Sequence, residues 1–239
     1  MKILSWNCNG AFRNKFKFLE SLNADILVIQ ECENPAESKD ANYKSWASNY
    51  LWIGDSKNKG LGVFAKKDIL LEKLDWSDQY QDHKVKYFLP CQINGQFNLC
   101  AVWTHKNNSP TFGYIGQFWK YLQLHKQKLT DIIILGDFNS NSRWDSWDRW
   151  WNHSNVVDEL SEIGIESTYH SFYDEKQGQE KQPTFYLHRN LDKSYHIDYC
   201  FASNHIISKM QNITVGEFKD WKQLSDHNPI IVTFEFEEI

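Results

Sequence analysis

Short runs of β-branched, aromatic and other apolar residues recur along the whole chain, separated by turn-forming residues. Eight such runs are typical of β-strands: residues 2–7, 25–30, 61–65, 87–93, 97–104, 131–135, 197–202 and 230–236. This number exceeds what one ordinary sheet holds. The run from Ile132 to Leu135 is apolar at every position, which indicates a strand that is covered on both faces.

Three other segments place apolar residues three or four positions apart, as on one face of a helix. These faces are Phe12, Phe16, Leu19 and Leu22; Ile115, Phe118, Trp119 and Leu122; and Val156, Val157, Leu160 and Ile163. Strands that are covered on both faces need packing elements on both sides of a sheet. We therefore expect an α/β protein in which two stacked sheets are flanked by helices.

The chain of 239 residues has no repeat, low-complexity tract or linker-like stretch, so we expect a single domain over residues 1–239. It has no stretch of about 20 apolar residues that could cross a bilayer, and its first residues do not resemble a secretion signal. The five cysteines lack a CxxC spacing, which favours buried thiols over disulfides or a zinc knuckle. These features predict a cytoplasmic protein with no membrane partner, and they imply no obligate protein partner.

The formal net charge is −5 at pH 7. Proteins that bind nucleic acids without sequence preference usually carry a basic surplus, because the basic groups neutralise phosphates. If this chain acts on a polyanion, a metal ion and a local basic rim must supply the attraction.

Polar clusters follow the predicted strands, where loops usually present reactive side chains. Asn7 and Asn9 end the first strand just before a glycine, and Glu31 ends the second. A turn explains the two asparagines when they are taken alone, and an ion pair explains Glu31 as well as a metal site does.

Two further clusters lie later in the chain. Asp137 and Asn139 follow the most apolar strand, so one turn can aim both at the same phosphate, although a plain turn has the same signature. Asp226 and His227 precede the last strand. Asp198 lies in an apolar run and needs a partner, since an unpaired buried charge is costly, and His227 is the obvious candidate.

The clusters together supply carboxylate and carboxamide oxygens, which suit Mg²⁺ or Mn²⁺ better than zinc. Hydrolysis of a phosphodiester needs a polarised phosphoryl oxygen, an activated water and stabilised charge on the leaving oxygen. The residue types in these clusters meet all three needs.

The ordered set of clusters resembles the endonuclease/exonuclease/phosphatase superfamily, which includes exonuclease III, abasic-site endonucleases, pancreatic deoxyribonuclease, sphingomyelinases and inositol polyphosphate 5-phosphatases. The resemblance is carried by WNCNG at 6–10, QE at 30–31, GLGVFAKK at 60–67, GDFN at 136–139, HIDYCF at 196–201 and SDHNPI at 225–230. It implies a four-layer α/β/β/α sandwich of two packed mixed β-sheets flanked by helices.

The resemblance also implies a metal site. Glu31 resembles the principal metal ligand of the superfamily, and Asn7 or Asn9 and Asp226 complete or support the site. Asn9 stands where several relatives have aspartate, which removes one charge.

The catalytic roles follow in the same way. Asp137 resembles the residue that orients or deprotonates the attacking water, and Asn139 the neighbour that contacts the scissile phosphate. His227 resembles the phosphate-binding histidine, which Asp198 holds in orientation.

One departure weakens any assignment to abasic-site repair. The abasic-site branch places a tyrosine in a Tyr-x-Pro-Asn context after the mid-chain strand, whereas this strand ends in Trp103, Thr104, His105 and Lys106. His105 is more similar to the second histidine of the deoxyribonuclease and sphingomyelinase branches, a candidate general acid for the leaving oxygen.

Candidates for substrate binding flank these clusters. Arg143 and Trp144 open a tryptophan-rich segment over residues 143–151 that is suited to stacking unpaired bases. A short helix that packs its tryptophans on the sandwich is the favoured alternative. Arg189 and Lys106 are candidates for a rim that contacts phosphates, with solvated surface as the alternative.

The leading hypothesis is a Mg²⁺- or Mn²⁺-dependent phosphodiesterase, a nuclease that hydrolyses DNA, with RNA as the second choice. The alternative keeps the chemistry and changes the substrate to a phospholipid head group or a small phosphate ester. A binding module that has lost catalysis is disfavoured, because each expected polar position holds a competent residue type.

Overall fold

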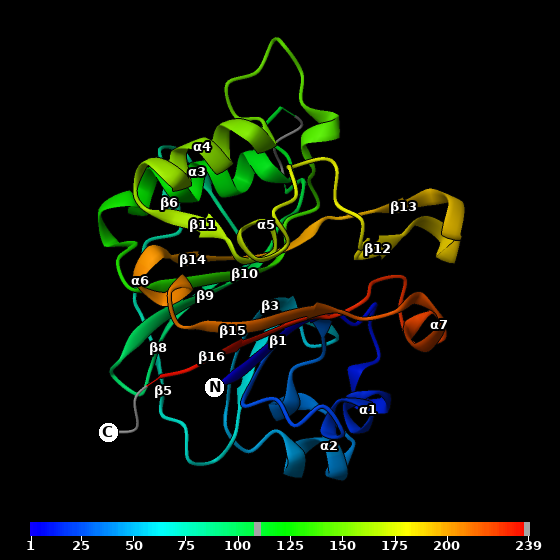
Figure 1. The fold of residues 1–239 in the computed structure, drawn as a ribbon. Helices are drawn as coiled ribbons and strands as arrows, with labels where there is room; N and C mark the ends of the chain where they lie inside the picture. Colours follow the sequence, from blue (N-terminus) through cyan, green and yellow to red (C-terminus); the bar gives the residue numbers. More distant parts are fainter. Residues whose placement is uncertain (108–110, 237–239) are drawn as a thin grey trace.

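The computed structural model describes residues 1–107 and 111–236. Within these residues the strands form two six-stranded sheets and two short ribbons (Figure 1). The first sheet has the order β15 (Met210–Val215), β16 (Ile230–Phe234), β1 (Lys2–Asn7), β2 (Ile26–Cys32), β4 (Lys59–Ala65) and β3 (Tyr50–Ser56). The second has the order β11 (Ile165–Ser167), β14 (Asp198–Ser203), β10 (Ile132–Asp137), β9 (Phe97–Trp103), β8 (Phe88–Ile93) and β5 (Leu71–Lys73). The ribbons are β6 (Gln79–Tyr80) with β7 (His83–Lys84), and β12 (Phe185–Tyr186) with β13 (Ser194–Tyr195).

Each sheet is mixed. Strand β1 pairs parallel to β2 in the first sheet, and β9 pairs parallel to β10 in the second, while the other neighbours pair antiparallel. The parallel pairs gather their carboxyl ends at one edge of each sheet. Asn7, Glu31 and Asp137 lie at these strand ends, whereas Asp198 begins the antiparallel β14, and Asp226 and His227 precede the antiparallel β16.

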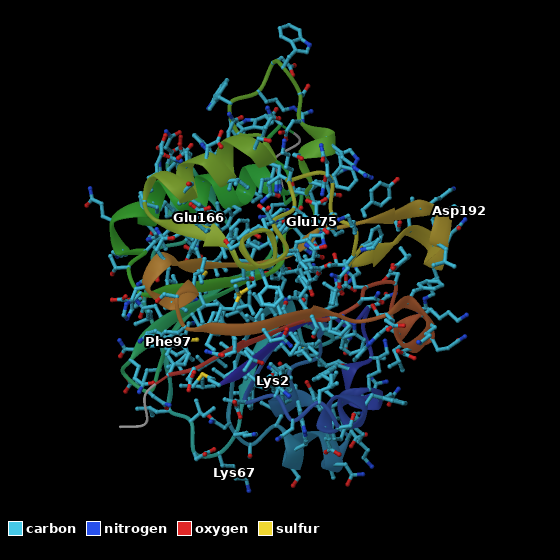
Figure 2. The ribbon with its side chains drawn as sticks, in the orientation of Figure 1. Lys2, Lys67, Phe97, Glu166, Glu175 and Asp192 are labelled. Atoms are coloured by element: carbon cyan, nitrogen blue, oxygen red, sulfur yellow. The ribbon has the colours of Figure 1, made fainter. Side chains whose placement is uncertain are left out.

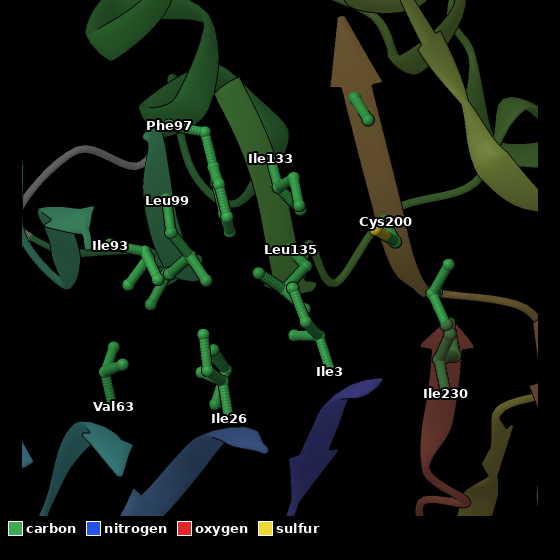
Figure 3. Close-up of a cluster of buried hydrophobic side chains, with 14 of the residues drawn as sticks. Ile3, Ile26, Val63, Ile93, Phe97, Leu99, Ile133, Leu135, Cys200 and Ile230 are labelled. Atoms are coloured by element: carbon green, nitrogen blue, oxygen red, sulfur yellow. The ribbon is translucent and has the colours of Figure 1, made fainter. Parts of the chain in front are cut away.

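The core between the sheets is built by alternation along the strands. In β10, Ile133 and Leu135 face the first sheet, whereas Ile132 and Ile134 pack on the opposite side. Figure 3 shows Ile133 and Leu135 together with residues of β1, β2 and β4 in the space between the sheets. This explains why the sequence of β10 is apolar at consecutive positions.

Helices cover the two outer faces. The helices of the described residues are α1 (Phe16–Glu20), α2 (Ala41–Trp46), α3 (Ile115–His125), α4 (His153–Glu162), α5 (Thr168–Tyr173), α6 (Asn204–Ile207) and α7 (Phe218–Trp221). Side chains of α1 and α2 pack on the first sheet, and those of α3 and α4 pack on the second (Figure 1). The fold is therefore the expected four-layer α/β/β/α sandwich.

The eight expected strands are all present, with boundaries shifted by up to two residues. The continuous helix expected from Phe12 to Leu22 is wrong. A 3₁₀ turn (Phe12–Asn14) and the five-residue α1 replace it, because the backbone of Lys15 leaves helical geometry between them. The helices in the described ranges are too short or too polar for a bilayer crossing.

Candidate active site

Three ionisable side chains meet at the ends of the second sheet. Asp137 is the last residue of β10, and Asp198, the first of β14, lies directly opposite in the antiparallel register. His227 comes from the loop before β16, and its Nδ1 donates to Asp198 Oδ2 at 2.9 Å. Among the described residues these three form the one group of three or more His, Cys, Asp or Glu residues whose candidate metal-ligating atoms lie within 4.8 Å of one another, and all three are buried. The structure thus brings together Asp198 and His227, the pair expected from the sequence.

Two carboxamides hold the Asp137 carboxylate. Asn7 Nδ2 donates to Asp137 Oδ2 at 2.9 Å across the two sheets. Asn139 donates twice, from its backbone N to Oδ1 at 2.8 Å and from its Nδ2 to Oδ2 at 2.9 Å. Gly136 is required just before this carboxylate, because its φ is +151° and a Cβ would lie 1.8 Å from the Val102 carbonyl oxygen.

The electrostatics of the three ionisable groups are coupled. Burial raises the pKa of Asp137 to about 7, and the charge of Asp198 adds to this rise while His227 and the hydrogen bonds oppose it. Burial lowers the pKa of His227, but Asp198, by charge and hydrogen bond, and then Asp137 outweigh burial and raise it to about 9. The site therefore holds an imidazolium beside a carboxyl group that can exchange protons near neutrality.

Backbone and hydroxyl contacts fix this geometry, and sequence reasoning did not single them out. Thr184 Oγ1 accepts hydrogen bonds from the backbone N–H groups of Ile197 and Asp198, both at 3.0 Å. Its carbonyl also accepts from Asn228 N at 2.7 Å. Thr184 gave no signal of its own in the sequence.

A second anchor ties the first strand to the last loop. Trp6 Nε1 donates to the His227 carbonyl at 2.9 Å, and Ser225 Oγ donates to the Asn7 carbonyl at 2.7 Å. All four residues belong to the segments at 6–10 and 225–230 that carry the family resemblance.

Glu31 lies on a β-bulge. The register of β2 against β4 shifts between Gln30 and Cys32, and Glu31 is the extra residue, with a φ of +64°. A left-handed backbone is unfavourable for glutamate and persists only where the surrounding structure holds it in place. Its Oε2 lies 2.9 Å from Lys59 Nζ, a partner that the sequence did not identify.

The other expected metal-site residues lie around the end of β1. Asn7 pairs with Gln30 in register, next to Glu31. Asn9 N donates to Asn7 Oδ1 at 3.0 Å. Asp226 neighbours Ser225, whose hydroxyl binds the Asn7 carbonyl. Asn7 is thus a member of the expected metal site and also donates a hydrogen bond to Asp137.

His105 lies beyond the end of β9. Its ring lies 4.1 Å from that of Trp103, centroid to centroid, and Trp103 is opposite Asp137 in the β9–β10 register. Its Nε2 is fully covered and has no hydrogen-bond partner among residues 1–107 and 111–236. Burial lowers the pKa of His105, and Lys59 lowers it further, whereas Glu31 and Asp55 raise it.

The tryptophan-rich segment does not form the expected packing helix. A 3₁₀ turn (Ser142–Trp144) is followed by irregular chain, in which Trp147 is 98% exposed. Figure 1 shows this loop standing clear of α3 and α4. The chain leaves helical geometry at Asp145, whose backbone is extended and whose carboxylate accepts hydrogen bonds from the backbone N–H groups at the start of α4.

The expected substrate-binding residues occupy different surroundings. Arg143 Nε donates to the Gly178 carbonyl at 2.9 Å, and the Trp144 ring lies 5.1 Å from that of Tyr195. Arg189 is exposed. Burial lowers the pKa of Lys15, and the positive charge of Arg189 lowers it further. The Nζ of Lys15 donates to the carbonyl of Cys8, the residue before Asn9. Lys106 is exposed beyond the end of β9, and its Nζ lies 5.9 Å from the centre of the Tyr114 ring.

Comparison with known proteins decides the family. The model of the endonuclease/exonuclease/phosphatase family matches residues 4–227. The chain belongs to this family. No curated protein sequence is similar enough to count as a match.

Solved structures share the fold of this family member at low sequence identity. A 3′ phosphatase from Neisseria, bound to a product DNA hairpin, has a TM-score of 0.73 and 18% identity, covering 99% of this chain and 100% of its own. A 3′-5′ exonuclease from Neisseria meningitidis has a TM-score of 0.72 and 17% identity, with the same coverage. An AP endonuclease from Archaeoglobus fulgidus has a TM-score of 0.71 and 17% identity, again covering 99% and 100%. Membership makes the chain a phosphate-ester hydrolase of the endonuclease/exonuclease/phosphatase type.

Proposed function

We propose that the protein is a Mg²⁺- or Mn²⁺-dependent phosphodiesterase that cleaves nucleic acid, with DNA preferred over RNA. One observation carries the proposal: the buried cluster of Asp137, Asp198 and His227, in which Asn7 and Asn139 hold Asp137 and Asp198 holds His227. It combines a group that can accept a proton with a cation that can bind a phosphate.

The residues divide the work of an in-line displacement. Asp137, with its pKa near neutrality, accepts the proton of the attacking water. His227 uses Nδ1 for Asp198, which leaves Nε2 to hold a phosphoryl oxygen. Asn139 lies beside Asp137, where its amide can donate to the same phosphate, and His105 beyond β9 protonates the leaving oxygen.

The expected metal ligands fit a hard divalent cation. Glu31, Asn7, Asn9 and Asp226 offer only oxygen side-chain ligands, which Mg²⁺ and Mn²⁺ prefer. The Lys59 ammonium, 2.9 Å from the Glu31 carboxylate, supports this assignment, since it occupies a position where a cation pairs with Glu31. A metal bound there would polarise the phosphoryl oxygen and stabilise charge on the leaving oxygen.

A row of aromatic rings supports a nucleic-acid substrate. The Phe185 ring lies 4.7 Å from His227, the Tyr195 ring 6.5 Å from Phe185, and the Trp144 ring 5.1 Å from Tyr195. Partly exposed rings leading away from a phosphate-binding group can stack bases that adjoin the scissile bond. Arg143 beside Trp144 and Arg189 supply positive charge nearby. The solved relatives named above include a complex with a DNA hairpin, which agrees with this choice.

The test is a substrate panel. Purified protein with Mg²⁺ or Mn²⁺ is assayed against linear duplex, single-stranded DNA, RNA and bis-nitrophenyl phosphate. We expect cleavage of DNA that needs the metal and that falls by at least about a hundredfold in Asp137→Ala and His227→Ala proteins. Full activity of both variants would contradict the roles. Turnover of the small ester without any cleavage of nucleic acid would favour a small phosphate ester or lipid head group as the substrate.

A further inference from the structure

A cavity of about 600 Å³ opens beside His105, lined by residues from β3, the β7–β8 region, the end of β9 and α3. Charged residues dominate its wall, with four lysines against two aspartates: Lys84, Lys86, Lys106, Lys120, Asp55 and Asp82. For a chain whose net charge is −5, this is a local excess of positive charge. Positive charge around a cavity beside His105 would attract an anionic substrate.

Two of the lysines are neutralised and two are not. Lys86 Nζ lies 2.8 Å from Asp55, and Lys84 Nζ lies 3.3 Å from Asp78. Within the described ranges, Lys106 and Lys120 have no carboxylate partner and no side-chain hydrogen bond; their ammonium groups lie near aromatic rings instead.

Lys120 is the more informative of the two. It is only 4% exposed, and its Nζ lies 4.6 Å from the centre of the Phe112 ring and 5.8 Å from that of Tyr80. The ammonium of a side chain that is mostly covered has little water around it, and two ring faces replace its hydration only in part. Burial accordingly lowers the pKa of Lys120.

His105 lines the same cavity at the end of β9. Its Nε2 is covered and has no hydrogen-bond partner among the described residues, so it offers no open donor to the cavity. The open donors are the ammonium groups of Lys106, beyond the end of β9, and of Lys120, on α3. A phosphate group has the charge and the several oxygen acceptors to satisfy both.

The cavity adjoins the proposed active site. The His105 ring touches that of Trp103, and Lys59 Nζ, which binds Glu31, lies 5.5 Å from the centre of the Trp103 ring. His105, Trp103 and Lys59 thus form a chain of side-chain contacts between the lysine cavity and Glu31. A substrate with a second phosphate close to the scissile one could fill both positions.

We propose that this cavity is a second phosphate site, in which Lys120 and Lys106 bind the substrate phosphate next to the one that is hydrolysed. The inference rests on the proposed function for its link to the reaction, but not for the binding of phosphate itself. It explains how an acidic protein attracts a polyanion, and it favours substrates with consecutive phosphates over simple monophosphate esters.

The first experiment needs no activity. Inorganic phosphate is titrated by calorimetry into metal-free protein and into Lys120→Met and Lys106→Met variants, with Lys67→Met as the matched control. Figure 2 shows Lys67 on the far side of the first sheet, away from α3. We expect the affinity for phosphate to fall about tenfold in Lys120→Met and severalfold in Lys106→Met, and to stay unchanged in the control. Equal affinity in wild type and in both cavity variants, or a loss of affinity in Lys67→Met as large as in them, would overturn the proposal.

A thermal melt separates binding from structure. Methionine fills the volume of the lysine stem and removes the buried charge, so the Tm of Lys120→Met should equal or exceed that of wild type. If Lys120→Met does not fold, the phosphate affinity of the exposed variant Lys106→Met decides alone.

The second experiment tests the link to the reaction. The ratio of kcat/KM on an oligonucleotide to kcat/KM on bis-nitrophenyl phosphate should fall about tenfold in Lys120→Met, because the small ester has no second phosphate. An unchanged ratio would show that the cavity does not contribute to cleavage of the oligonucleotide. If wild-type protein does not cleave the oligonucleotide, the proposed function fails, and the phosphate titration still decides whether the cavity is a phosphate site.

Discussion

Replacing Asp198 with asparagine should neutralise His227 at pH 7. The change keeps the shape of the side chain and an oxygen acceptor for His227 Nδ1, which now lies 2.9 Å from Asp198 Oδ2. It removes the charge that, with its hydrogen bond, outweighs burial and raises the pKa of His227 to about 9. In the Asp198→Asn protein that pKa should fall towards its ordinary value, because burial still lowers it and only the charges of Asp137 and Asp226 still raise it.

The magnitude follows from the pKa. The difference between about 9 and the ordinary value of about 6.5 corresponds to roughly 3 kcal/mol in favour of the charged imidazole in the folded state. A histidine with a raised pKa stabilises the fold fully below pH 6.5 or so, and this contribution is lost as the pH rises through about 9. Asp137 titrates near pH 7, so most of the loss above pH 7.5 belongs to His227.

The assay combines urea unfolding of metal-free protein between pH 6.5 and 9.5 with an NMR titration of the histidine rings. Wild type should lose roughly 2–3 kcal/mol of stability over this interval relative to Asp198→Asn. The kcat/KM at pH 7 should fall by about a hundredfold or more in the variant, since a neutral His227 binds the phosphate less well. Parallel stability profiles for the two proteins, or an unchanged histidine titration, would refute the reasoning.

Three further changes probe the site and its supports. Thr184→Val leaves the N–H groups of Ile197 and Asp198 without a buried acceptor, so the free energy of unfolding should fall by roughly 2–4 kcal/mol and kcat should drop. Thr184→Ser should restore both. Urea unfolding curves with equal midpoints would contradict this. Lys59→Met removes the cation that competes for Glu31 and should tighten Mn²⁺ binding up to about fivefold in calorimetry, whereas Glu31→Gln should abolish it; weaker binding in Lys59→Met would show that Lys59 supports the metal instead. Burial lowers the pKa of His153 to about 4, so its stabilising contribution is complete above about pH 6.5 and is lost as the pH falls towards 4, a loss of roughly 3 kcal/mol that His153→Gln should remove from the acid unfolding profile.

The sequence predicts the interior strands well because their pattern depends on burial. Strand β10, covered on both faces, is apolar at consecutive positions, and the structure confirms it. The edge strand β15 escapes notice because Gln211 and Asn212 face solvent and leave little apolar pattern. Edge strands are held by the backbone of a neighbour, which the sequence does not display.

For the site, the sequence reveals which polar groups need partners but gives little about distant ones. The costly burial of Asp198 leads directly to His227. The pairing of Glu31 with Lys59 depends on the register of β2 against β4, and the role of Thr184 depends on where a polar loop returns to the sheet. That loop is polar in composition, yet the side chain of Glu180 within it is buried against Asn141 and His170. No apolar pattern in the sequence announces this burial.

The hydrogen bond from Trp6 to the His227 carbonyl spans 221 positions of the chain. Synthesis by the ribosome delivers the two ends of this contact at widely separated times, so a growing chain that has not reached His227 holds the carboxamides of β1 and the carboxylate of β10 without the imidazole. Because the proposed phosphate-binding group is then missing, we expect such a chain not to cleave the messenger or the nucleic acids around it. For the same reason we expect a premature stop codon upstream of His227 to yield an inactive fragment.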